Sequence, residues 1–148
     1  MRTLDLGWNA IGTRGGRYLG DALKDSHNLL ELRLPWNGLA DRGARALGEA
    51  LGANGILNVL DLEHNAIKDE GGRAIVKGLR TNSALRELLL EHNGLSSVVR
   101  DEARAALDME PELPSKPTST TGQGYAPRSS SSNEDDDDVE EINFDDDA

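Results

Sequence analysis

The chain has 148 residues, a formal net charge of −11 and no cysteine. The lack of thiols excludes disulfide frameworks, thiolate metal sites and cysteine nucleophiles. The acidic balance argues against direct binding to nucleic acid, because that affinity depends largely on Lys and Arg.

The N-terminus, which begins MRTLDLGWN, has neither the basic stretch nor the apolar core of a signal peptide. No apolar run approaches the ~20 residues that a membrane-spanning helix needs. We therefore expect a cytoplasmic protein with no membrane partner, and nuclear or axonemal placement stays open.

Four similar segments make up residues 1 to about 110, and each contains an apolar core of the form LxxLxLxxN. The segments are MRTLDLGWNAIG, LLELRLPWNGLA, LNVLDLEHNAIK and LRELLLEHNGLS. They begin at Met1, Leu29, Leu57 and Leu85, so the period is 28 residues. Self-similarity at a fixed period is the signature of a repeat architecture.

Each repeat combines two patterns of apolar residues. A short alternating stretch predicts a strand, and the longer stretch after it has helical spacing, as at Ala46, Leu47, Ala50 and Leu51. A strand, a helix and a further parallel strand form a right-handed crossover, and repetition at constant length stacks the strands in one sheet. The sequence therefore predicts an α/β right-handed solenoid with parallel strands inside and helices outside.

Small and acidic residues mark the turn and the start of each helix. Glycines of the linking turns are Gly12, Gly38 and Gly94. Asp41 and Asp69 are predicted to cap exposed N–H groups at helix starts. A recurring glycine, expected to let the helix approach the strand layer closely, is found at Gly15, Gly43 and Gly71.

One asparagine ends the core of every repeat, at Asn9, Asn37, Asn65 and Asn93. A buried amide at the end of a strand satisfies backbone groups of the turns above and below it. We therefore interpret these residues as a structural ladder of the turns and not as catalytic groups.

The LxxLxLxxN core and its period resemble the ribonuclease-inhibitor-like class of leucine-rich repeats, over residues 1 to about 110. That class includes ribonuclease inhibitor, the sensing arms of nucleotide-binding leucine-rich-repeat receptors and the Ran GTPase-activating proteins. The resemblance implies a horseshoe segment that docks partners on its concave strand face. Ribonuclease inhibitor itself is cysteine-rich and alternates two repeat types, whereas this chain has one repeat type and no cysteine.

The two ends of the array differ. Met1 occupies the first apolar position of a repeat, so we expect either further coding sequence upstream or another cover for that end. The fourth repeat lacks the glycine-bearing helix start, which indicates a terminal, partly polar turn, and Pro111 and Pro114 end helical structure. We therefore divide the chain into a repeat domain, residues 1–112, and a tail, residues 113–148.

Residues between and after the strand leucines are predicted to line the concave face, where stacking places equivalent positions ~4.8 Å apart. Charged residues recur there, at Asp5, Arg33, Asp61, Glu63 and Glu91. The position before each asparagine holds a large ring, at Trp8, Trp36, His64 and His92. Both tryptophans of the chain thus fall in one column.

Two interpretations of this column stand side by side. In the first, the rings stack on one another and shield the asparagine turns from water. In the second, Trp8 and Trp36 anchor an apolar group of a partner, because large rings on a rigid sheet lose little entropy on binding, and the neighbouring charges select that partner.

The EHN motif of repeats three and four contains residue types that bind zinc, namely Glu63, His64, Glu91 and His92. Adjacent residues of an extended strand point to opposite faces, so we do not expect these side chains to converge on an ion. Nothing in the sequence marks a nucleophile or a closed pocket. We expect no metal, no cofactor and no enzymatic activity.

The tail carries 2 basic and 10 acidic residues and is predicted to be disordered, because it is too polar to offset its ordering entropy. Val139, Ile142 and Phe144 form an apolar cluster among carboxylates that suits a basic surface on a partner. Ser131 and Ser132 each stand three residues before an acidic residue and are candidate phosphorylation sites.

These observations predict a module that binds another protein on its concave face, with a basic protein surface among the candidate partners. Two alternatives stay open. One is a regulator of a small GTPase, resembling the Ran GTPase-activating proteins, and the other is a truncated sensor arm of a nucleotide-binding receptor. The sequence contains no phosphate-binding loop of the GxxxxGK(S/T) type.

Overall fold

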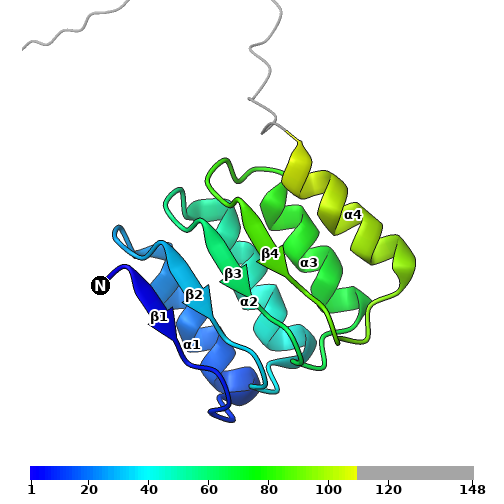
Figure 1. Ribbon diagram of the computed structural model, residues 1–148, viewed down its shortest axis with the longest axis horizontal. Coiled ribbons are helices and arrows are strands. Elements are labelled where there is room, and N and C mark those ends of the chain that lie inside the picture. Colours follow the sequence, from blue (N-terminus) through cyan, green and yellow to red (C-terminus); the bar gives the residue numbers. More distant parts are fainter. Residues whose placement is uncertain (110–148) are drawn as a thin grey trace, which may run out of the picture. The chain divides into compact units, whose positions relative to one another are not determined.

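The computed structural model describes residues 1–109. Strands and helices alternate through this range: β1 (Thr3–Asp5), α1 (Gly12–Lys24), β2 (Glu31–Arg33), α2 (Ala40–Ala53), β3 (Val59–Asp61), α3 (Asp69–Leu79), β4 (Glu87–Leu89) and α4 (Ser97–Asp108). Figure 1 shows the strands side by side in chain order, with the helices behind them. The predicted α/β solenoid is confirmed, whereas the tail with Ser131 and Ser132 lies outside the described residues.

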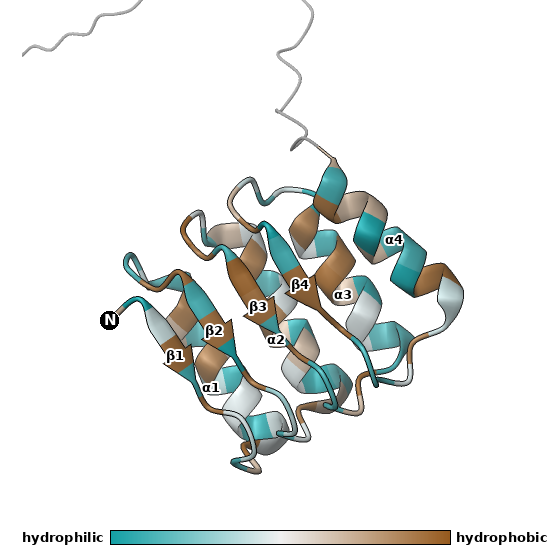
Figure 2. Ribbon diagram, viewed as in Figure 1, coloured by the Kyte–Doolittle hydropathy of each residue, from teal (hydrophilic) through white to brown (hydrophobic). Residues whose placement is uncertain are grey.

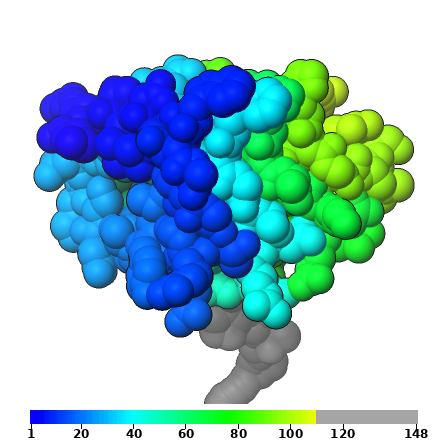
Figure 3. Space-filling model, turned by 90° about the horizontal axis from the view of Figure 1, so that it is seen from below, coloured from blue at the N-terminus to red at the C-terminus, as the bar shows by residue number. Residues whose placement is uncertain are grey.

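The sheet keeps the register of the repeat. The strand order is β1-β2-β3-β4, and all pairs are parallel. Leu4 pairs with Leu32, and Leu32 pairs with Leu60, so each step across the sheet is one repeat in the sequence. Figure 3 shows the repeats following one another in the same order. Equivalent residues therefore lie side by side in columns across the sheet.

Leucines between the sheet and the helices form the core, and they appear as brown positions on strands and helices in Figure 2. The central repeats are the best packed. Leu32 is 1% exposed and Leu60 is 0% exposed. Their counterpart in the first repeat, Leu4, is only partly buried, because no preceding strand among the described residues covers it.

The recurring glycines serve a contact that differs from the one predicted. A Cβ at Gly15 would overlap the side chain of Ile11, and a Cβ at Gly43 would lie 2.9 Å from the Cβ of Leu39. Ile11 and Leu39 belong to the turn before each helix. Gly15 and Gly43 therefore make room for the apolar turn residue, whereas a Cβ at Gly71 would lie 2.9 Å from the Cβ of Ala44 in α2. The nearest atoms at these glycines belong to the turn or to the neighbouring helix, and not to the strand layer as the sequence suggested.

The two predicted capping carboxylates act across the repeat boundary. Asp41 Oδ1, at the start of α2, accepts hydrogen bonds from the N–H groups of Lys68 (2.8 Å) and Gly71 (2.9 Å) at the start of α3. Asp69 Oδ1 accepts in the same way from the N–H of Ser96 at the start of α4 (2.7 Å). Asp41 thus caps the helix of the next repeat instead of its own, whereas Asp69 holds Ser96, whose own side chain caps α4. Both carboxylates tie neighbouring helices together.

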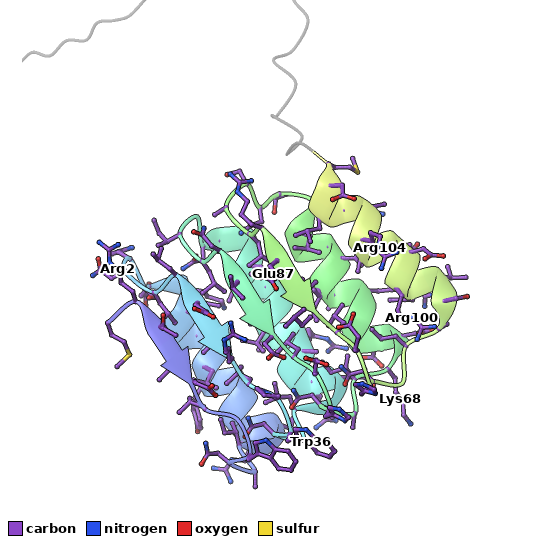
Figure 4. The ribbon with its side chains drawn as sticks, in the orientation of Figure 1. Arg2, Trp36, Lys68, Glu87, Arg100 and Arg104 are labelled. Atoms are coloured by element: carbon purple, nitrogen blue, oxygen red, sulfur yellow. The ribbon has the colours of Figure 1, made fainter. Side chains whose placement is uncertain are left out.

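The last repeat presents polar side chains on its helix. Arg100 and Arg104 project from α4, as Figure 4 shows. Arg100 stands at the repeat position that Gly72 occupies in α3. Its Nη1 donates to the carbonyl of Leu95 (3.2 Å). Within residues 1–109, none of the helices has the length and apolarity to cross a bilayer.

Candidate functional site

The sheet face is the surface of β1 to β4 that points away from the helices. In each strand the central leucine is more buried than the residue before it, so the leucines face the helices and the flanking residues lie on the sheet face, where Asp61 is only 6% exposed. One flanking column is Thr3, Glu31, Val59 and Glu87. The other is Asp5, Arg33, Asp61 and Leu89. Figure 4 shows Glu87 projecting from β4 on this face.

Arg33 is the one basic residue in these two columns and is held by its neighbours. Its Nε donates to Glu31 Oε2 at 2.6 Å, and its Nη1 lies 4.0 Å from Asp61 Oδ2. The hydrogen bond with Glu31 raises the pKa of Arg33, and the charges of Glu31, Asp61 and Asp5 raise it further. Arg33 therefore stays charged and compensates Glu31 and Asp61.

Several carboxylates of the sheet face and of the turns beside it form no ion pair within the part of the chain that the structure describes. Within residues 1–109, ion pairs involve none of Asp5, Glu63, Glu87 and Glu91. Asp5 Oδ1 accepts a hydrogen bond from the N–H of Gly7 at 2.9 Å, which shapes the turn and leaves its charge in place. The sheet face and the turn beside it thus display uncompensated negative charge.

The ring ladder consists of Trp8, Trp36, His64 and His92, in the turns that follow the strands. Successive ring centroids lie 4.4, 3.9 and 4.2 Å apart, with interplanar angles of 14°, 10° and 10°. The backbone sets this spacing, because Trp8 N–H donates to the Pro35 carbonyl (2.9 Å) and Trp36 N–H donates to the Glu63 carbonyl (3.1 Å). Figure 4 shows Trp36 beyond the end of β2.

All four ladder residues have a left-handed backbone, with φ of 63°, 59°, 54° and 59°. A residue in this conformation does not continue the alternation of an extended strand. The expectation that Glu63 and His64 diverge is therefore wrong, because the ligand atoms of Glu63, His64 and His92 all lie within 4.8 Å of one another. The error came from extending the strand geometry into the turn.

Stacking still limits these side chains as metal ligands. The imidazoles of His64 and His92 are 4.2 Å apart and nearly parallel, at 10°. A metal ion bound by an imidazole nitrogen lies in the plane of that ring, so two stacked rings do not share one ion. Glu63 with a single histidine offers two ligands, fewer than the three or four protein ligands typical of zinc sites.

The asparagine ladder lies directly behind the rings and holds the turns together. Asn37 Oδ1 accepts from the N–H groups of Asn9 (3.0 Å) and Ile11 (3.1 Å) in the preceding repeat. Asn37 Nδ2 donates to the carbonyls of Leu6 (2.8 Å) and Pro35 (3.2 Å). Equivalent bonds are made by Asn65 and Asn93. These amides leave little capacity for a ligand.

A second asparagine column was not predicted from the sequence. Asn54 is 3% exposed; its Nδ2 donates to the carbonyl of Leu23 (2.7 Å), and its Oδ1 accepts from the N–H of Leu57 (2.8 Å). Asn82 repeats this arrangement one turn later. Its signal in the sequence was the spacing of Asn54 and Asn82 by one repeat period.

Both tryptophans are among the exposed large hydrophobic residues of the repeat region. Trp8 is 72% exposed and Trp36 is 43% exposed, although both are large aromatic residues. They border an open hollow of about 480 Å³. The hollow is lined by Trp8, Ala10, Gly12, Trp36, Asn37 and Gly38. The tryptophan end of the ladder is thus an accessible apolar surface.

Comparison with known proteins agrees with this architecture. A family model described as Leucine Rich repeat matches residues 1–20, 25–48 and 54–76. No curated protein matches the chain.

Two solved structures are similar to the repeat region. The structure of Leiomodin-1 Actin-Binding Site 2 (ABS2) has a TM-score of 0.63 and 23% identity, and the match covers 72% of this chain and 63% of that one. The tropomodulin C-terminal domain from Caenorhabditis elegans has a TM-score of 0.49 and 16% identity, with coverage of 72% and 82%. The chain thus spans about 63% of the leiomodin structure, and that likeness shows the fold.

Proposed function

Because the chain is a leucine-rich-repeat protein, we propose that it works as a protein-binding module whose sheet face, edged by the ring ladder, takes the partner. The observation that carries this proposal is the 72% exposure of Trp8 at the end of a rigid stack. Tryptophan dominates interface hot spots because it supplies a large contact area at a small loss of conformational entropy.

The ring ladder has a structural role as well, and the two roles divide among its members. A left-handed backbone at a residue other than glycine costs about 1–3 kcal/mol, and stacking of aromatic pairs returns about 0.5–1.5 kcal/mol per pair. Trp36 and His64 stack on both faces and thereby stabilise the turns. Among the described residues Trp8 stacks on Trp36 alone, and 72% of its surface is left accessible to a partner.

Site-specific crosslinking tests the sheet face as the binding surface. A photo-crosslinking amino acid at Val59, on β3, is compared with the same amino acid at Glu49, on the exposed side of α2. We expect crosslinks to a partner from position 59 and few from position 49. Crosslinks from position 49 alone would contradict the proposal.

The ladder is tested in the same capture with the double variant Trp8→Ala/Trp36→Ala. The matched control is Tyr18→Ala, because Tyr18 is an aromatic residue of α1 with 66% exposure. We expect the tryptophan variant, shown to be folded by circular dichroism, to lose the partner that the tyrosine variant keeps. Retention by the tryptophan variant, with loss by a chain shortened to Glu112, would place binding in residues 113–148.

Actin is a candidate partner only because the similar leiomodin-1 structure is named as an actin-binding site. At 23% identity that likeness carries the fold and not the binding. Co-sedimentation with filamentous actin is a direct assay, and a negative result would remove actin while leaving the proposed binding surface in place.

A further inference from the structure

We propose that the occupant of the sheet face is a basic segment of a partner protein, whose Arg and Lys side chains pair with its carboxylates and whose Arg side chains stack on Trp8. This inference rests on the proposed function, because it names the partner class for the same surface. The observation that supports this inference is the unequal charge of the helices and of the sheet face with its turns.

Negative charge is concentrated on one side of the fold. The helices α1 to α4 carry nine basic and eight acidic residues and are thus almost balanced. The two flanking columns and the turn positions next to the ring ladder carry one basic residue, Arg33. Their acidic residues are Asp5, Glu31, Asp61, Glu63, Glu87 and Glu91. A cationic partner segment is therefore complementary to this side.

The compensated and uncompensated carboxylates are spatially ordered. Arg33 pairs with Glu31 and Asp61 at the centre of the sheet face. Asp5 lies on one side of this group, whereas Glu63 and Glu91 belong to the turns of the third and fourth repeats. An extended basic segment that crosses the strands thus meets acidic groups on both sides of Arg33, and guanidinium groups pair with carboxylates in a bidentate geometry.

The end of the ring ladder adds a contact that selects arginine. The outer ring face of Trp8 has no ring stacked on it among the described residues, because Trp36 covers the other face. A planar guanidinium stacks on an indole face, whereas a compact ammonium group makes a smaller contact. Trp8 therefore favours an arginine over a lysine at this end of the segment.

Charge also argues against the chain's own tail as the occupant. Residues 113–148 carry 10 acidic and 2 basic residues, the same sign as the sheet face. Like charges placed opposite each other oppose docking. A second copy of the chain is an alternative outcome, and sedimentation of the chain alone detects it by mass.

The test uses the full chain and its intrinsic fluorescence. Its two tryptophans both belong to the ring ladder, so fluorescence reports on this site without a label. Three Gly/Ser peptides of equal length are titrated, one with regularly spaced Arg, one with Lys and one with Glu. We expect a fluorescence change with the Arg peptide, weaker binding of the Lys peptide and none of the Glu peptide. Binding should weaken towards ~0.15 M salt, because exposed ion pairs are screened.

Neutralising selected carboxylates tests which of them bind the Arg peptide. Glu63→Gln/Glu91→Gln keeps the shape of both side chains, and the matched control Glu49→Gln/Asp101→Asn removes the same charge from exposed positions of α2 and α4. We expect about a 5-fold weaker affinity for the Arg peptide in the first variant, as two exposed ion pairs imply, and little change in the second. Trp8→Leu should reduce the preference for Arg over Lys.

The outcomes separate this inference from the proposed function. Equal binding of the Arg and Glu peptides, or equal loss in both neutralised variants, would overturn the basic class of partner. Crosslinking from Val59 would then still support the sheet face as a binding surface. Association of the chain with itself through this face, weakened by the Glu63→Gln/Glu91→Gln variant, would replace the partner segment by a second copy and also overturn the inference.

Discussion

At the scale of the residue, buried amides and carboxylates connect one repeat to the next. Asn65 is 0% exposed and uses both ends of its amide, with Oδ1 accepting from Asn37 N–H (3.0 Å) and Nδ2 donating to the carbonyl of Leu34 (2.8 Å). A buried polar group without a partner is costly, so each amide stabilises a turn that would otherwise lose several hydrogen bonds.

The asparagine ladder predicts that an alanine substitution lowers stability more at a buried ladder position than at an exposed one. Asn65→Ala should lower the free energy of unfolding by about 3 kcal/mol, because it leaves several buried backbone groups unsatisfied. Asn9→Ala should cost less than about 1 kcal/mol, since Asn9 is exposed and its amide bonds only within its own turn. Urea unfolding measures both values, and equal losses would contradict a ladder that acts between repeats.

The hydrogen bond between Asp69 and Ser96 predicts a pH dependence. The hydrogen bonds from Ser96 lower the pKa of Asp69 below its ordinary value of 3.8, and Arg73 lowers it further. The stabilisation is therefore complete above pH 3.8 and is lost as the pH falls through the lower pKa of the folded state.

Unfolding of wild type and Asp69→Asn across acid pH tests the contribution of this hydrogen bond. We expect wild type to be more stable by a constant amount above about pH 4, with a difference that shrinks at lower pH. Asp101→Asn, an exposed change on α4, is the control and should show a smaller pH dependence. A wild-type advantage that persists undiminished in acid would show that the charge of Asp69 is not what stabilises the helix.

At the scale of the element, glycines determine how closely the helices pack. A Cβ at Gly48 of α2 would overlap the carbonyl oxygen of Ala74 in α3, and a Cβ at Gly78 would overlap the carbonyl oxygen of Gly48. The two helices thus touch through their backbones. A solenoid of constant pitch depends on such contacts, because any added side chain pushes neighbouring repeats apart.

Adding one methyl group at this contact should therefore be destabilising. Gly48→Ala is expected to lower the free energy of unfolding by about 2 kcal/mol, as overpacking does, despite the better helix propensity of alanine. Gly55→Ala is the control, because no atom lies within 4 Å of its added Cβ, and we expect a change within about 0.5 kcal/mol. Thermal unfolding by circular dichroism distinguishes them, and an unchanged Gly48→Ala would contradict the close backbone contact.

At the scale of the whole repeat region, burial is highest in the middle and falls towards the ends. Leu32 and Leu60 are almost fully buried, whereas Leu4 and Leu88 are only partly buried. In a repeat array each unit contacts only its neighbours, so a terminal unit has one stabilising interface instead of two. The ends should therefore open at a lower free energy than the centre.

Hydrogen exchange measured by mass spectrometry tests this gradient. We expect the slowest exchange in β3 and α3, at residues 59–79, and faster exchange in β1 and α1, at residues 3–24. The reason is local opening of the first repeat without unfolding of the rest. Uniform exchange along residues 1–109 would instead show that the repeats unfold as one cooperative unit.

The sequence by itself determined the period, the order of strands and helices, and the columns of the sheet. It did so because four uninterrupted copies leave one register in which the strand leucines all face the helices. Even the ring column was visible, since Trp8 and Trp36 share a repeat position. These features depend on spacing along the chain, which a sequence records directly.

Only the tertiary structure decided how the columns meet. The left-handed backbone at His64 brings its ring towards Glu63, and the carboxylate of Asp41 caps the next helix. Both results depend on backbone angles and on distances between segments one repeat apart. Spacing alone does not encode them, because the same residue types at the same interval fit an extended strand or a tight turn, and a cap within a helix or between two helices.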